Sequence, residues 1–428
     1  MLPQMSRKKL FQIIIRKTID FLHPLWRRRD NSRFSHCLFD MACALTRSIF
    51  KCDAFTVETH DHYLNDHKDS EKTVIKKNRE GCYANIVWSE KEKQEIWNKP
   101  MNDLCLYKHH DVYVCGDSDV VIDYKEKTAI HDLSYNLTGY YRFGDSFALD
   151  VRDGMMLVKR LEHKNVKIVK SGIMIAALYS YNYFHAVLDN LIRLLAVDEC
   201  DIPGDAVFIV DSVIYKYESL KKIFDVLTEK SNRQVVLLEK RELLHVDTLY
   251  YITHVNEFVI KIDNWKLGRY DDYTFDWFYM QQLRERLLAL KKTDISFGSR
   301  VFISRKNIPR RSFNEAELMD SIKEYGFVSV CPEEFCLEDQ IALFNNADVI
   351  VSSSGAAMTN LLFCKPGSKA LIIEGMKHQS SMYSLIPAKI GMYNLHYSIQ
   401  IPVNGKVDEN FSLDVDDFMN AFRVFMSL

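Results

Sequence analysis

Short apolar runs alternate with amphipathic stretches from about residue 168 onward. The apolar runs have the length of buried strands, and the stretches between them have helical spacing. Strands are expected at 172–177, 206–210, 234–238 and 246–252, and helices at 182–197, 217–227 and 275–290. Strands that alternate with helices in this way predict a parallel sheet that is covered on both faces.

The alternation begins again at residue 300. Strands are expected at 300–304, 327–330, 348–351 and 370–373, and helices at 314–325, 337–346, 356–363 and 414–426. Upstream, residues 106–161 carry short alternating runs that predict antiparallel strands. We therefore expect an α/β protein with two doubly wound lobes that face a cleft. In such sheets ligands bind beyond the carboxyl ends of the strands.

Length and composition set the domain count. A chain of 428 residues allows two to three domains of about 150 residues each. We expect four portions: an N-terminal basic amphipathic and accessory segment (1–104), an N-lobe (105–292), a C-lobe (293–410) and a C-terminal helix (411–428). The 47% hydrophobic residues exclude a disordered chain. The net charge of −2 gives no global field that would recruit nucleic acid.

The N-terminus is locally basic. Residues 1–33 hold nine Lys and Arg against two Asp, with apolar residues between them. Such a segment either lies peripherally on an anionic membrane or packs on the protein with a solvated basic face. Its longest apolar run, 10–15, is far shorter than the roughly 20 residues that span a bilayer. We expect a cytoplasmic protein with peripheral contact at the inner membrane face, although sequons at Asn136 and Asn410 argue against a reducing compartment.

Two stretches in the second half could bind a phosphate. The strand ending near Val351 is followed by small residues, Ser352 to Ala357, and then by a predicted helix start, where backbone N–H groups can meet an anion. Arg305 follows another strand, and Arg310 and Arg311 precede the next helix, so guanidinium groups could converge on a diphosphate. The alternatives are small residues kept for packing and arginines that are simply solvated.

A third stretch carries ionisable groups on an apolar helix. His185, Asp189 and Arg193 recur at intervals of four residues along one face of the helix expected at 182–197. Such groups are costly to bury unless they are paired or line a cavity. They form either a structural pair or a general base, because a histidine beside a carboxylate is suited to proton transfer near pH 7.

Together these stretches resemble glycosyltransferase family 61, which includes plant xylan transferases and protein O-GlcNAc transferases. Four motifs appear in the family's order, at Tyr183–Leu194, Ser304–Glu315, Pro332–Val351 and Ser352–Gly367. The resemblance implies a GT-B architecture, that is, two Rossmann-like lobes facing a cleft, and an inverting mechanism without a cofactor. It implies a nucleotide-sugar donor in the C-lobe, a glycan or glycolipid acceptor in the N-lobe, and a role in surface or capsular polysaccharide biosynthesis.

Carried over residue by residue, the resemblance also implies a set of site residues. His185 or Asp189 would be the catalytic base. The donor-binding residues would be Arg305 and Arg310 on the diphosphate, Ser354, Gly355, Thr359 and Asn360 in the strand-to-helix cradle, and Glu374 on the ribose hydroxyls.

The chain also departs from the family pattern. Ser354 and Ala357 stand where the family usually has His and Gly, and Ala186 and Ile192 stand where it has Trp and Pro. These departures favour the alternative of a degenerate, non-catalytic member that scaffolds glycan assembly. A DxD triplet at 117–119 is a weak metal signal. Since arginines and a helix start can neutralise a leaving diphosphate, we expect no required metal.

Overall fold

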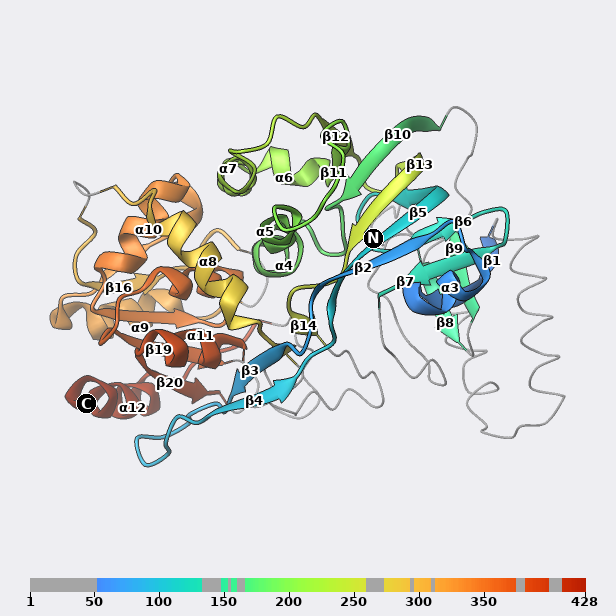
Figure 1. The fold of residues 1–428 in the computed structure, drawn as a ribbon. Helices are drawn as coiled ribbons and strands as arrows, with labels where there is room; N and C mark the ends of the chain where they lie inside the picture. The colour runs from blue at the N-terminus through green and yellow to red at the C-terminus, as the bar shows by residue number, and fades with distance from the viewer. Residues whose placement is uncertain are drawn as a thin grey trace, which may run out of the picture.

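The computed structural model describes residues 52–132, 148–152, 155–159, 166–258, 273–292, 296–308, 312–374, 382–399 and 410–428. The expectations for residues 1–33, Asn136 and Arg310 lie outside these ranges. The fold is mixed α/β, as predicted, with a sheet of eleven strands and a sheet of five (Figure 1). No described helix is long and apolar enough to cross a membrane.

One half of the larger sheet is parallel. Its strands are β10 (Lys167–Met174), β11 (Val207–Asp211), β12 (Val235–Leu238) and β13 (Leu243–Ile252), in the order β12-β11-β10-β13. The helices α6 (Ser212–Lys216) and α7 (Glu218–Leu227) connect β11 to β12. The connections from β10 run to β11 on one side, and the later strand β13 lies on the other side of β10. The direction in which strands are added thus reverses between β10 and β13, and such sheets bind ligands at this topological switch point.

The other half of the larger sheet begins where β13 pairs antiparallel with β5 (Leu104–Cys115). Beyond β5 the order is β6, β7, β1, β9 and β8, and β2 also pairs with β5. The bounds are β1 (Cys52–Thr59), β2 (Glu71–Lys76), β6 (Val121–Asp123), β7 (Thr128–His131), β8 (Ala148–Arg152) and β9 (Met155–Lys159), with α3 (His60–Asp66) after β1. The antiparallel pairing of β5, β6 and β7 confirms the pattern predicted from residue 106 onward.

The five-stranded sheet is parallel throughout, in the order β17-β16-β18-β19-β20. Its strands are β16 (Arg300–Ile303), β17 (Val328–Val330), β18 (Val349–Ser353), β19 (Lys369–Glu374) and β20 (Tyr393–Ser398). Its helices are α9 (Glu315–Ile322), α10 (Leu337–Asn346), α11 (Met382–Ile390) and α12 (Val415–Ser427), and α8 (Trp277–Leu288) precedes the sheet. The topological switch point of this sheet, where the direction in which strands are added reverses, lies between β16 and β18.

The two sheets are joined by a common core. One cluster of buried side chains includes Ile173 of β10, Leu188 of the helix after it and Ile350 of β18. A hairpin of β3 (Glu80–Ala84) and β4 (Ile96–Pro100) also reaches the last strand of the five-stranded sheet (Figure 1). There His396 donates a backbone hydrogen bond to the Val87 carbonyl at 2.8 Å. The described residues between 52 and 103 therefore contribute to the larger sheet and contact the five-stranded one.

Candidate functional site

The helix predicted at 182–197 is present but is not uniform. It consists of α4 (Tyr183–His185), the π-helix η1 (Ala186–Asn190), the 3-10 helix η2 (Leu191–Arg193) and α5 (Leu194–Val197). It begins at Asn182, whose side chain accepts a hydrogen bond from the Phe184 N–H. Single π-helical turns of this kind are frequent at functional sites.

His185 and Asp189, the two candidate bases, lie next to each other. His185 Nδ1 is 2.7 Å from Asp189 Oδ2, and their side chains are 20% and 15% exposed. The other carboxylate oxygen, Oδ1, accepts a hydrogen bond from the Tyr273 hydroxyl. The Tyr179 ring packs on the imidazole with centroids 5.1 Å apart. One imidazole nitrogen and both oxygens of the carboxylate are thus held in place.

Arg193, the third group on this helix, has a different role. Its side chain is fully buried and donates to main-chain carbonyls, those of Ile175 at 2.7 Å, Ile252 at 3.4 Å and Asn190 at 3.4 Å. Ile175 follows β10 and Ile252 ends β13. The guanidinium therefore ties the helix to the point between β10 and β13 where the sheet changes direction.

A buried carboxylate orders the loop that leads into this helix. Asp211, at the end of β11, accepts hydrogen bonds from the backbone N–H groups of Asp117 (2.7 Å) and Ala177 (3.0 Å) and from the Ser180 hydroxyl. Burial raises the pKa of Asp211 to about 6. Asp211 thus fixes the turn after β5 and the segment before α4 at the same sheet edge.

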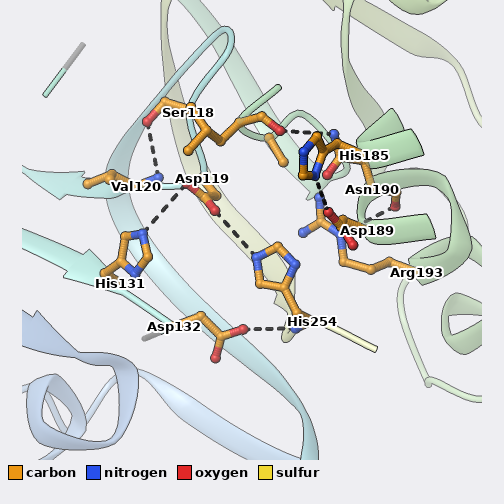
Figure 2. Close-up of polar contacts among 12 residues, drawn as sticks. Ser118, Asp119, Val120, His131, Asp132, His185, Asp189, Asn190, Arg193 and His254 are labelled. Carbon is orange, nitrogen blue, oxygen red and sulfur yellow. Dashed lines mark hydrogen bonds and ion pairs between the residues drawn. The ribbon is translucent and has the colours of Figure 1, made fainter. Parts of the chain in front are cut away.

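An acid-histidine cluster that sequence reasoning missed lies at this edge (Figure 2). Asp119 lies between the imidazoles of His131 and His254, at nitrogen–oxygen distances of 3.6 and 3.4 Å. Asp132 accepts a hydrogen bond from the backbone N–H of His254 at 2.8 Å. Burial alone would raise the pKa of Asp119, but the two imidazoles outweigh it and hold that pKa well below its usual value. Burial lowers the pKa of His254, and the Asp119 carboxylate outweighs this and raises it.

The DxD triplet that contains Asp119 is buried in the connection between β5 and β6. Asp117 and Asp119 are each 7% exposed, and β5, which precedes them, lies between β13 and β6. His131 ends β7 and His254 follows β13, two strands that are distant in sequence, so only the sheet order could have revealed the cluster. Over the described ranges, no three His, Cys, Asp or Glu side chains are arranged to hold a metal ion.

Arg305 and Gly355 meet at the corresponding edge of the five-stranded sheet. Arg305 follows β16, and Gly355 follows β18. A Cβ at position 355 would lie 2.1 Å from Arg305 Nη1, so the guanidinium rests on the glycine backbone. The φ of Gly355 is 174°, an extended value open to any residue, and the constraint is therefore one of space. Glu315 holds the loop in place, accepting from the Ser304 hydroxyl and from the Arg305 N–H at 2.9 Å.

The remaining predicted donor residues are buried. Ser354, Thr359 and Asn360 are at most 5% exposed, and the segment after Gly355 is the 3-10 helix η6 (Ala356–Phe363). Glu374, at the end of β19, is fully buried and lies 3.1 Å from His396 Nδ1. Their contact with a donor stays a prediction, as does that of Arg310, which lies outside the described ranges.

A hydrogen bond joins the two groups of residues. The Tyr183 hydroxyl, two residues before His185, donates to Asn360 Oδ1 at 2.9 Å. Asn360 Nδ2 in turn donates to Gln340 Oε1 of α10 at 3.0 Å. The helix that carries the candidate bases is thereby connected to the segment that begins at Gly355.

Comparison with known proteins gives one family. Residues 183–371 match the family model described as Glycosyltransferase 61. The match begins at Tyr183 and ends within β19, so it includes both candidate bases, Arg305 and the turn at Gly355. No curated protein matches the chain. The family predicted from the sequence motifs is thereby confirmed.

Proposed function

Residues 183–371 form a domain of glycosyltransferase family 61, and we propose that the chain is a glycosyltransferase. It moves a sugar from a nucleotide-diphosphate donor to a glycan or glycolipid acceptor. The observation that carries the proposal is the Tyr183–Asn360 hydrogen bond. It connects the helix that bears a histidine–carboxylate pair to the segment against which Arg305 packs. A proton acceptor and an anion-binding group thereby belong to one site.

The donor diphosphate binds at Arg305 and the start of η6. The backbone N–H of Ser354 donates to the Ile373 carbonyl, and the backbone N–H of Met358 donates to the Gly355 carbonyl. We therefore assign the backbone N–H groups between them, those of residues 355–357, to the diphosphate. Ala356 and Ala357 are half-buried, whereas the rest of the turn is buried. An arginine beside a helix start stabilises the charge on a leaving diphosphate. We propose that this makes a metal ion unnecessary.

His185 is the base and Asp189 orients it. Nδ1 of His185 is engaged by Asp189, so the acceptor proton is taken at Nε2. The acceptor O–H bond breaks as the N–H bond forms, and the oxygen electron pair attacks the anomeric carbon. The bond from that carbon to the diphosphate oxygen breaks, and its electron pair leaves with the diphosphate. Attack in line with departure inverts the anomeric configuration.

Several finer features belong to the same proposal. We place the two sheets in a GT-B arrangement, with the donor on the five-stranded sheet and the acceptor on the larger one. Arg310 and Glu374 are assigned to the diphosphate and the ribose. The acceptor is a surface or capsular glycan or its lipid-linked precursor, and residues 1–33 hold the enzyme peripherally at the inner membrane face. This basic segment supports the assignment because a lipid-linked acceptor lies at a membrane.

Donor binding can be tested without knowledge of the acceptor. A panel of nucleotide sugars is screened by thermal unfolding, because a ligand at 100 times its dissociation constant adds about 2.7 kcal/mol to the free energy of unfolding. The binding donor is then titrated calorimetrically into the wild type and Arg305→Ala. We expect one nucleotide class to stabilise the wild type and to bind Arg305→Ala at least about tenfold more weakly. Equal affinity for both proteins would refute the proposed donor site.

A further inference from the structure

Asp189 holds His185 with one oxygen and is itself held through the other. Its Oδ2 lies 2.7 Å from His185 Nδ1, and its Oδ1 accepts the hydrogen bond of the Tyr273 hydroxyl. Tyr273 comes from β15 (Tyr273–Thr274), far along the chain from the helix that carries the other two. The three side chains form a continuous hydrogen-bonded series from tyrosine to carboxylate to imidazole.

Tyr273 is itself fixed in position. Its backbone pairs with Phe258 of β14 (Glu257–Phe258), and its side chain is 1% exposed. The ring packs edge-on against Phe184 at 5.2 Å between centroids and lies 4.9 Å from Phe275. Burial and the neighbouring Asp189 charge raise the pKa of Tyr273 well above its ordinary value. The hydroxyl therefore remains protonated and acts as a donor.

We propose that Tyr273 is a positioning residue of the transferase: it holds the Asp189 carboxylate in the orientation that keeps the His185 proton on Nδ1 and its basic electron pair on Nε2. This inference rests on the proposed function, in which His185 accepts the proton of the acceptor hydroxyl. A carboxylate that can rotate would let the neutral imidazole exchange tautomers, and the wrong tautomer cannot accept a proton at Nε2. Tyr273 itself does not touch the substrate.

The test compares Tyr273→Phe with Tyr279→Phe. Tyr279 is a matched control, because it is also fully buried and its hydroxyl donates to a carboxylate, that of Glu199, at 2.8 Å. The tautomer of His185 is read from nitrogen-15 NMR of the histidine side chains, with the His185 signals assigned by their loss in His185→Gln. The same proteins are assayed for kcat and for KM of the donor.

We expect a single Nδ1–H tautomer in the wild type and Tyr279→Phe, and a mixture in Tyr273→Phe. Tyr273→Phe should lower kcat about 10- to 100-fold with donor KM unchanged. A single Nδ1–H tautomer and wild-type kcat in Tyr273→Phe would overturn the positioning role. A different result would refute the proposed function itself. That result is a His185→Gln protein that turns over as fast as the wild type, whichever tautomer the NMR experiment shows.

Discussion

Gly355 leaves the space that the guanidinium of Arg305 occupies. The Cβ of any other residue would lie 2.1 Å from Nη1, and the glycine backbone is extended, so the requirement at 355 is for the missing side chain. Arg305 and Gly355 follow β16 and β18, the two strands between which the five-stranded sheet changes direction. The position of the Arg305 guanidinium thus explains why residue 355 is a glycine.

Gly355→Ala should impair donor binding without unfolding the protein. The added methyl meets the far end of a flexible side chain, which can move aside, so we expect the free energy of unfolding to change by less than about 1 kcal/mol. The dissociation constant for the nucleoside diphosphate should rise about tenfold as the guanidinium is displaced. Calorimetric titration and urea unfolding measure the two quantities.

Gly204→Ala is the control for this substitution, because nothing lies within 4 Å of a Cβ at position 204. Gly204→Ala should change neither the dissociation constant for the nucleoside diphosphate nor the free energy of unfolding. Wild-type nucleotide affinity in Gly355→Ala would mean that the guanidinium position seen beside Gly355 is irrelevant to the donor.

Asp211 should make stability fall as pH rises. Burial raises its pKa to about 6 from 3.8, so between these values the folded state holds a proton that the unfolded state has released. The free energy of unfolding therefore decreases across this window by up to about 3 kcal/mol. Above pH 6 Asp211 is ionised in both states, and the full decrease is present. Urea unfolding of the wild type and Asp211→Asn at pH 4 and pH 7 isolates the effect. The wild-type advantage over the variant should shrink at pH 7, and an advantage that grows with pH would contradict the assignment.

Asp119→Asn should destabilise the larger sheet. The carboxylate lies between His131 and His254, and both it and His131 are buried. Because Asp119 raises the pKa of His254, its neutralisation leaves the His254 imidazole without its counter-charge. We expect a loss of about 2–4 kcal/mol in the free energy of unfolding at pH 6. Asp111→Asn is the control, because Asp111 also pairs with a histidine, His245 at 2.7 Å, but its side chain is 76% exposed. That exposed pair should contribute less than about 1 kcal/mol. Equal losses in the two variants would show that the Asp119 pairs are no stronger than a surface pair.

The hydrogen bond between Tyr183 and Asn360 should couple the two halves of the site. A double-mutant cycle of Tyr183→Phe and Asn360→Ala, measured as kcat/KM, should show a coupling energy of about 0.5–1.5 kcal/mol. Gln340→Ala with Tyr183→Phe is the comparison, because Gln340 bonds Asn360 and not Tyr183. Strictly additive effects of Tyr183→Phe and Asn360→Ala would show that the bond plays no part in turnover.

Much of the five-stranded sheet could be predicted from the sequence. Parallel strands buried on both faces are continuous apolar runs, and such runs predict the strands at 300–303 and 349–353 to within two residues. The last strand and the helix before it were missed. The strand, Tyr393–Ser398, alternates with polar residues, and the helix contains Pro387. Both features weaken the local signal.

The candidate site was predictable only in part. His185 and Asp189 are four residues apart on one helix, so their contact follows from local spacing. Tyr273 is 84 residues from Asp189, and nothing in its own segment indicates the bond. The π-helical turn between His185 and Asn190 has no apolar periodicity of its own. From the sequence, Asp119 is only part of a weak DxD metal signal, because its histidine partners are brought to it by the order of strands in the sheet.

The most direct test of the account is sugar transfer by the wild type, His185→Gln and Arg305→Ala. Release of the nucleoside diphosphate is measured with the donor that stabilises the protein and a panel of glycan acceptors. We predict acceptor-dependent release by the wild type, a decrease of at least about 100-fold in His185→Gln, and impaired release in Arg305→Ala. A wild type that releases no nucleoside diphosphate from any donor, or a His185→Gln protein with full turnover, would contradict the proposed function.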